Sequence, residues 1–266
     1  MKNSKRFSSE DWQAESFLSS TQLSTCRALF FRNAKEMSLS VLSLPRLNAD
    51  LKDRNPASTY LTPSELERLA SFTFAKRHVE WLGGRIAAKK AAMALLASRS
   101  CPPIVCQDVS VETHSTGRPF LRCQTDPSAI LPEISISHSG NYAAALSVMG
   151  QSCGIDLQRI TTTVLTVRER FASNSELELI LSKRHSLEKS AALTLLWSAK
   201  EALRKAIVCQ PLVGFSEITL LSLEGNPQNG MTGHFSCPRV SPVLLPVFLL
   251  LRDEYACAIV VVAPST

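Results

Sequence analysis

The sequence predicts an α+β fold of two similar lobes, each with helices packed on a small antiparallel sheet. Two observations predict this fold class. An Ala-rich helical segment at 77–97 and an apolar, periodic segment around 193–207 are each followed by several short strand-like segments. No internal sequence repeat is evident, but both halves share this order of elements.

Composition favours a folded chain with a negatively charged partner. With 266 residues, of which 45% are hydrophobic and 20% charged, the chain can bury two modest cores and is not extensively disordered. Lys and Arg exceed Asp and Glu by 29 to 23, a formal charge of +6. This excess is consistent with nucleic acid, a membrane surface or a phosphorylated small molecule and does not choose among them.

The cysteines and apolar segments favour a cytoplasmic protein. None of the eight cysteines forms a C-x-x-C pair, and most have apolar neighbours, so we expect free thiols in the core. No secretory signal is apparent at the N-terminus, which favours a reducing compartment. The apolar run at 243–251 contains Pro246 and is too short to span a bilayer.

The chain is expected to divide into a leader and two lobes. Residues 1–36 are rich in Ser, Lys and Arg and predict an irregular leader. A mitochondrial presequence is disfavoured, because acidic residues stand at 10, 11 and 15. The turn at 149–152 separates an N-terminal lobe, 37–150, from a C-terminal lobe, 151–266.

Basic residues gather on the helical part of the N-terminal lobe. A first strand is expected at 38–44, and a short helix at 62–69 begins with Thr62 as cap and Pro63 at its first position. The helix at 77–97 brings Arg77, Arg85 and Lys89 within reach of one face, beside small residues. This arrangement indicates a close approach by an anion. Strands are expected at 108–112, 133–139 and 142–148.

The C-terminal lobe contains a carboxylate within an apolar strand and a charged pair on a helix. A core strand at 153–157 holds Asp156, a helix is expected at 167–182, and a long helix ends before Pro211. Strands at 218–223, 232–236, 247–251 and 256–262 follow. On the long helix Glu201 and Lys205 stand one turn apart, which on many helices is only a solvated ion pair worth about 0.2–0.5 kcal/mol.

Asp156 decides between two interpretations of that pair. A lone ionised carboxylate in an apolar strand needs a partner, and an ion pair with Arg159 or Lys200 would satisfy it. If instead Asp156 and Glu201 converge, the two carboxylates suit Mg²⁺, which prefers oxygen ligands and is usually completed by substrate phosphates. Both interpretations remain open from the residues alone.

His138 lies at the end of a strand, between two serines and before Gly140, in a corner suited to binding an anion. A serine hydrolase with Ser137 or Ser139 as nucleophile is disfavoured, because no G-x-S-x-G sequence is present. Zinc is disfavoured by the absence of His and Cys at ligand spacing. The sequence also lacks the phosphate loops G-x-x-x-x-G-K-[ST] and G-x-G-x-x-G.

Four motifs together resemble those of the surfactin-type 4′-phosphopantetheinyl transferases. In chain order they are GRPFL at 117–121, ISISHS at 134–139, GID at 154–156 and WSAKEALRK at 197–205. The stretch from Arg77 to Lys89, with EWLGGR at 80–85, is similar to the subgroup that includes the enterobactin-synthase transferase. The resemblance covers residues 38–262.

The resemblance implies a reaction and a set of roles. Members transfer the phosphopantetheine arm of coenzyme A to a serine of an apo carrier protein and release adenosine 3′,5′-bisphosphate. They are monomers of two similar lobes related by a pseudo-two-fold axis, with the active site between the lobes, where coenzyme A binds. By resemblance, Asp156 and Glu201 hold Mg²⁺, Glu201 helps to deprotonate the serine directly or through water, and Lys205 stabilises or protonates the leaving bisphosphate. The implied contacts to the 3′-phosphate and diphosphate are Arg85, Lys89, Arg118, Ser137 and His138, with Arg77 as a further candidate.

One position departs from the family pattern. Many members carry a second acid two residues after the Asp, where this chain has Gln158. Gln offers only a neutral oxygen or orients a metal-bound water, so we expect altered metal binding with activity retained. The missing acid is also the one feature that favours the alternative function, a catalytically impaired basic protein that binds coenzyme A or nucleic acid. The carrier protein and its pathway are not readable from the sequence.

Overall fold

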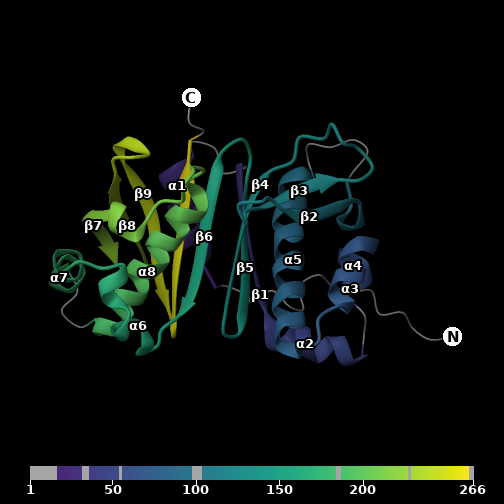
Figure 1. Cartoon of the computed structure of the whole chain (residues 1–266), viewed down its shortest axis with the longest axis horizontal. Helices are drawn as coiled ribbons and strands as arrows, with labels where there is room; N and C mark the ends of the chain where they lie inside the picture. Colours follow the sequence, from purple (N-terminus) through teal and green to yellow (C-terminus); the bar gives the residue numbers. More distant parts are fainter. Residues whose placement is uncertain are drawn as a thin grey trace.

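Two antiparallel sheets form the centre of the molecule, and a long helix covers one face of each (Figure 1). The computed structural model describes residues 17–31, 36–53, 56–97, 104–183, 187–226 and 229–263. The mixed composition of helices and antiparallel strands confirms the predicted α+β class.

The N-terminal half is built on a three-stranded sheet. Its order is β1 (Met37–Ser43), β5 (Tyr142–Val148), β4 (Glu133–Ser139), and both pairings are antiparallel. Helix α5 (Ala75–Leu96) packs on this sheet, and small residues such as Ala143 and Ala145 allow the helix to come close. Shorter elements complete this half: α2 (Leu44–Asp53), α3 (Ala57–Tyr60), α4 (Pro63–Ala70), a turn of 3₁₀ helix (Cys106–Asp108) and the hairpin of β2 (Val109–Thr113) and β3 (Pro119–Cys123).

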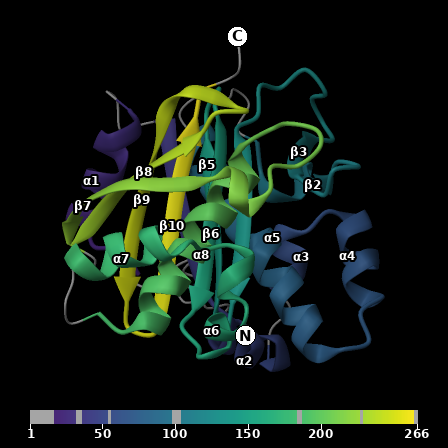
Figure 2. The same cartoon turned by 60° about the vertical axis from the view of Figure 1, so that its left-hand side comes forward.

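The C-terminal half contains a five-stranded sheet, seen from the side of α8 in Figure 2. Its order is β6 (Ser152–Arg159), β10 (Tyr255–Val262), β9 (Ser241–Arg252), β8 (Gly230–Cys237), β7 (Thr219–Asn226). Helix α8 (Lys189–Ala206) buries its apolar stripe against β6 and β10. The remaining elements are α6 (Thr163–Thr166), α7 (Asn174–Lys183) and 3₁₀ turns at Arg168–Arg170 and Phe215–Glu217.

A third core joins the two sheets and is closed by an N-terminal helix. Side chains of β1 and β5 meet those of β6, β9 and β10, and helix α1 (Ser20–Phe30) adds Cys26, which is fully buried. A capping box between Ser19 and Gln22 begins this helix. The expectation that residues 1–36 form an irregular leader is therefore wrong for 17–31; residues 1–16 and 32–35 lie outside the described part. The division into lobes near residue 150 remains a prediction.

A buried lysine–glutamate pair occurs once in each half, in equivalent places. Lys89 of α5 lies 2.5 Å from Glu65, and Lys200 of α8 lies 2.8 Å from Glu176. Each ammonium also donates to a backbone carbonyl 29 residues earlier, and each glutamate accepts an N–H from a later strand, β2 or β7. The two halves thus repeat one arrangement. The sequence Ser-Glu-Leu-Glu at 64–67 and again at 175–178 carries this repeat, so the statement that no repeat is evident is wrong.

Most predicted elements are present, with differences at their ends. The first strand ends at Ser43, and Pro45 stands in the first turn of α2, where its missing N–H is tolerated. Strand β3 was not predicted, and β9 begins at Ser241 rather than 247. The described cysteines are all free, as predicted. Among the described residues, no helix has the length and apolar character to cross a bilayer.

Candidate functional site

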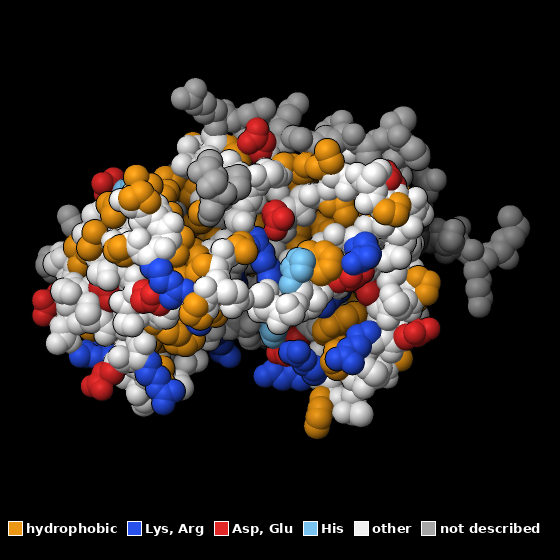
Figure 3. Space-filling view, turned by 45° about the horizontal axis from the view of Figure 1, so that its top comes forward, with side chains coloured by type: hydrophobic (Ala, Val, Ile, Leu, Met, Phe, Trp, Pro, Cys, Tyr) orange, Lys and Arg blue, Asp and Glu red, His pale blue; other side chains and the backbone are white. Residues whose placement is uncertain are grey.

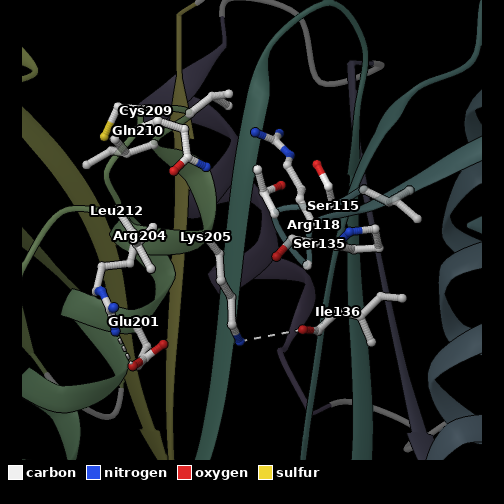
Figure 4. A pocket seen from close by; sticks show the side chains of 16 residues that line it. Ser115, Arg118, Ser135, Ile136, Glu201, Arg204, Lys205, Cys209, Gln210 and Leu212 are labelled. Atoms are coloured by element: carbon white, nitrogen blue, oxygen red, sulfur yellow. Dashed lines mark hydrogen bonds and ion pairs between the residues drawn. The ribbon is translucent and has the colours of Figure 1, made fainter. Parts of the chain in front are cut away.

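A pocket of about 760 Å³ is formed by elements from both halves of the chain. The N-terminal half contributes the turn between β2 and β3 and part of β4, and the C-terminal half contributes the end of α8 and the segment after it (Figure 4). The residues used below are Arg118, Ser135, Ile136, Glu201, Arg204 and Lys205. The pocket thus lies where the two halves of the chain meet.

Gly154 brings helix α8 close to strand β6. A Cβ atom at Gly154 would lie 1.9 Å from the backbone oxygen of Ala202, so any side chain at this position would force the helix away. Gly154 stands two residues before Asp156, on the same face of β6. The Gly-Ile-Asp sequence therefore serves two purposes: the glycine admits the helix, and the aspartate meets the helix's side chains.

Asp156 and Lys205 form a partly buried ion pair where the two halves meet. Lys205 Nζ lies 2.8 Å from Asp156 Oδ1 and also donates to the carbonyls of Ile155 at 2.9 Å and Ile136 at 3.5 Å. The ammonium therefore has three acceptors, from β4 and β6. The alternative partners of Asp156 are excluded, since Arg159 pairs with Glu254 and Lys200 pairs with Glu176.

Glu201 is held by Arg204 instead of Lys205. Arg204 Nη1 donates to Glu201 Oε1 at 3.0 Å, while its Nε donates to the carbonyl of Val213 at 2.9 Å. The guanidinium also stacks over the ring of Phe215, 4.4 Å from the centroid. In Figure 4 the Lys205 side chain points away from Glu201, toward the Ile136 carbonyl. The solvated Glu201–Lys205 ion pair considered from the sequence is therefore not formed.

The donor set fits a magnesium ion that substrate phosphates complete. Asp156 is 7% exposed, and its Oδ2 atom is buried without any hydrogen-bond partner. Leaving such an oxygen unpaired is costly unless a ligand uses it. Within the described residues, no group of three or more His, Cys, Asp or Glu could hold a metal alone. One or two carboxylates suffice for Mg²⁺, which retains water and binds phosphate oxygens.

The residues predicted to contact phosphate lie in different parts of the structure. Arg118 lines the pocket and is anchored by Glu133, 3.0 Å away. Arg77 and Arg85 line a second hollow of about 550 Å³ between α4, α5 and β2. The guanidinium of Arg85 lies 4.5 Å from the centroid of the Trp81 ring, and its Nε is buried without a partner. Figure 3 shows Lys and Arg side chains gathered beside the notch between the two halves.

His138 lies between these two groups of basic residues. Its Nε2 is 3.7 Å from Glu80 on α5. Partial burial lowers the pKa of the imidazole; Glu80 acts in the opposite direction, and the positive charges of Arg77 and Lys205 lower the pKa further. The pKa of His138 therefore lies below that of an ordinary histidine, and the ring is close enough to both Arg77 and Lys205 to feel their charges.

Two residues that were predicted to contact coenzyme A instead form hydrogen bonds within the protein. Lys89 is fully buried and bonded to Glu65, so the prediction that it binds coenzyme A is wrong. Ser137 is 5% exposed, and its hydroxyl donates to Asp156 and accepts the N–H of Leu157. The hydroxyl of Ser137 is thus used within the protein, and the contact of Ser137 with the diphosphate stays a prediction.

Sequence reasoning missed Arg204, the residue that holds Glu201. Its only sequence signal is its place three residues after Glu201, which puts the two side chains on one helix face. The Arg204 guanidinium stacks on Phe215 because the fold brings the two residues together, and no local sequence pattern predicts this contact. Gln158, the position of the absent acid, is half-buried on the same face of β6 as Asp156.

The environment of His138 predicts a measurable titration. In the free protein its pKa should lie below 6.5, because partial burial and nearby cations disfavour the imidazolium. Addition of adenosine 3′,5′-bisphosphate should raise this pKa, since a phosphate dianion favours the charged ring. Side-chain NMR of the histidines measures both values. The signals of His234, on β8, serve as the internal reference. An unchanged pKa of His138 would place the phosphate elsewhere.

Comparison with known proteins relates the C-terminal half to one family. The model described as the 4′-phosphopantetheinyl transferase superfamily matches residues 152–260. A holo-[acyl-carrier-protein] synthase of Bacillus subtilis is 33% identical over 93 residues, 35% of this chain and 75% of the relative. A synthase of the same description from Staphylococcus carnosus is 30% identical over 89 residues, 34% of this chain and 73% of the relative.

A solved structure of similar description also aligns with the chain. It is a holo-(acyl-carrier-protein) synthase from Bacillus anthracis in complex with coenzyme A (3′,5′-ADP), at 24% identity with a TM-score of 0.34. The alignment covers 42% of this chain and 93% of that one. The family assignment depends on the sequence relatives and not on this overlap.

Proposed function

This chain belongs to the 4′-phosphopantetheinyl transferase superfamily, and on that premise we propose that it transfers the phosphopantetheine arm of coenzyme A to a serine of an apo carrier protein. The observation that carries the proposal is the unpartnered Oδ2 of Asp156, buried where α8 meets β6. A buried oxygen of this kind is available to a cation, and a cation there lies beside a pocket lined by basic residues. A cation and nearby basic residues are what binding of a diphosphate substrate requires.

Coenzyme A would lie across the seam between the two halves. The main pocket offers Arg118, whose planar guanidinium suits phosphate oxygens. Arg77, which lies beside His138, extends the positive charge toward the second hollow, where Arg85 lies. Because one chain supplies both walls of the pocket, we propose that a monomer is sufficient for activity. Lys89 and Ser137 are not part of this proposed set.

The proposed transfer is a substitution at phosphorus. The carrier serine oxygen bonds to the β-phosphorus of coenzyme A, the bond from that phosphorus to the bridging oxygen breaks, and adenosine 3′,5′-bisphosphate leaves. Glu201 takes the serine proton directly or through water, on its oxygen that is not bonded to Arg204. Asp156 and Glu201 would hold Mg²⁺, which when bound neutralises charge on the transferred phosphoryl group.

Lys205 is proposed to act as a fixed positive charge. Protonating the leaving group would require its ammonium to give up one of three hydrogen bonds, to Asp156 or to the carbonyls of Ile155 and Ile136. Electrostatic stabilisation of the leaving bisphosphate requires no such exchange. The three hydrogen bonds of Lys205 therefore favour electrostatic stabilisation of the leaving group over protonation of it.

Gln158 offers a direct test of the metal site. Replacement with Glu adds a carboxylate on the same face of β6 as Asp156 and should lower the Mg²⁺ concentration needed for half-maximal activity about tenfold. The measurement is a Mg²⁺ titration of the transfer rate. Glu254→Gln, which changes an exposed carboxylate paired with Arg159, is the control. An unchanged Mg²⁺ requirement in Gln158→Glu would remove position 158 from the site.

The alternative is a basic protein that binds coenzyme A or nucleic acid without catalysis. Incubation with coenzyme A, Mg²⁺ and an apo carrier protein separates the two functions. Transfer predicts that the carrier gains the mass of one phosphopantetheine arm, and that a carrier whose acceptor serine is Ala gains nothing. A nucleic-acid binder would instead show steep salt-dependent DNA binding and leave the carrier unmodified. Testing a panel of apo carriers also identifies the partner, which we propose is acidic because this chain is basic.

A further inference from the structure

Three serines of β4 bind the backbone of β6 at regular intervals. The hydroxyls of Ser135, Ser137 and Ser139 accept the N–H groups of residues 155, 157 and 159, each at 3.0 Å. The spacing between donor and acceptor is 20 residues in all three cases. We call these three contacts the serine ladder. It joins the edge strand of one sheet to the edge strand of the other.

The serine ladder joins β4 to β6 through side chains, since the two strands belong to different sheets. Strand β4 uses its backbone to pair with β5, while its serine side chains point to the face that carries Ala144 and Leu146 on β5. Strand β6 crosses this face, and the short hydroxyls reach its N–H groups. Buried N–H groups need acceptors, so Ser135 and Ser137 satisfy the buried donors of Ile155 and Leu157, while the contact of Ser139 is exposed.

Ser137 differs from the other two serines because it also contacts Asp156. Its Oγ accepts the N–H of Leu157 and lies 3.2 Å from Asp156 Oδ1. The carbonyl of Leu157 is a more distant acceptor, at 3.5 Å. A hydroxyl has one proton to donate, and the charged, nearer oxygen is the better acceptor.

The two oxygens of Asp156 consequently have different roles. Oδ1 receives Ser137 at 3.2 Å and Lys205 at 2.8 Å, whereas Oδ2 is buried without a partner. Two donors on one oxygen fix the orientation of the carboxylate. The remaining oxygen is then held toward a ligand, and it does not rotate to find a partner within the protein.

We propose that Ser137 is a positioning residue, which fixes the Asp156 carboxylate so that Oδ2 is presented to a divalent cation. The inference rests on the proposed function in assigning the cation to Asp156, and it adds a role that the phosphate-contact prediction for Ser137 did not contain. When a hydrogen bond holds a metal ligand in place, loss of that hydrogen bond lowers the affinity for the metal about 10–100-fold.

Ser135 supplies a matched control. It is buried like Ser137 and accepts an N–H in the same ladder, but it has no hydrogen bond to Asp156. Ser135→Ala and Ser137→Ala should therefore lower the unfolding temperature by similar amounts, because each leaves one buried N–H unpaired. Only Ser137→Ala should weaken binding of Mn²⁺, by about tenfold. Ser137→Thr retains a hydroxyl and should recover affinity.

The experiment measures free Mn²⁺ by electron paramagnetic resonance, with the full chain and saturating coenzyme A. Equal Mn²⁺ affinity in the two alanine variants would overturn the proposal, and so would the absence of Mn²⁺ binding to the unaltered chain. If Ser137→Ala does not fold, Ser137→Cys against Ser137→Thr gives the same comparison, since a thiol is a weak donor. Selective loss of Mn²⁺ affinity without transfer to any carrier would retain this inference and reject the proposed function.

Discussion

Replacement of Asp156 with Asn is expected to reduce the transfer rate about 10²–10³-fold, the range found when one preorganised electrostatic group is removed from an active site. The amide is nearly the same size and can still fill the space between Ser137 and Lys205. It lacks the negative charge that balances Lys205 and would hold the cation. The rate of carrier modification at saturating coenzyme A measures the effect.

Folding of this variant must be checked separately, because the Lys205 ammonium loses a charged partner. It retains the carbonyls of Ile155 and Ile136, so the variant should fold. Asp253→Asn is the control: this residue lies in an exposed turn with φ 50°, which Asn tolerates. A rate unchanged in Asp156→Asn would show that this carboxylate neither binds the cation nor supports the reaction.

Replacement of Lys89 with Met is expected to lower the free energy of unfolding by about 3–5 kcal/mol, because it leaves Glu65 as an uncompensated buried charge. Lys89 is fully buried, and its ammonium is bonded to Glu65 and to the carbonyls of Tyr60 and Cys106. Denaturant unfolding measures the loss. Lys200→Met, the equivalent change in the other half, should cost a similar amount.

The same variant tests whether Lys89 contacts coenzyme A. Where Lys89→Met is folded, its KM for coenzyme A should equal that of the unaltered chain, since the side chain is fully buried. Lys76→Met, at an 85% exposed side chain, controls for loss of positive charge and should leave stability unchanged. A stable Lys89→Met protein with a raised KM would return this lysine to the binding site.

Local sequence patterns predicted the helices α4, α5, α7 and α8, most strands and the motifs that line the pocket, but not α1, α2 or α3. The apolar periodicity of α8 and the cap of α4 depend only on residues close in the sequence, so the sequence alone is enough to predict both features. The partner of each charged side chain could not be predicted from such local patterns. Asp156 and Lys205 are 49 residues apart, and their pairing follows from how closely Gly154 lets α8 approach β6.

The alternating Ile and Ser residues of β4 show a second limit. Alternation correctly predicted a strand, but serines on one face usually indicate solvent. Here that face meets β6, and Ser135 and Ser137 are buried. The sequence repeat at 64–67 and 175–178 was visible but short, and only the matching ion-pair networks give it meaning.

The central claim, that this chain transfers phosphopantetheine, is tested most directly by the stoichiometry of products. A single incubation with coenzyme A, Mg²⁺ and an apo carrier protein is analysed for released adenosine 3′,5′-bisphosphate and for carrier that has gained the arm. Transfer predicts that the two amounts remain equal throughout the time course. Bisphosphate released without modified carrier would indicate hydrolysis of coenzyme A, and bound but intact coenzyme A with unmodified carrier, across the panel, would contradict the account.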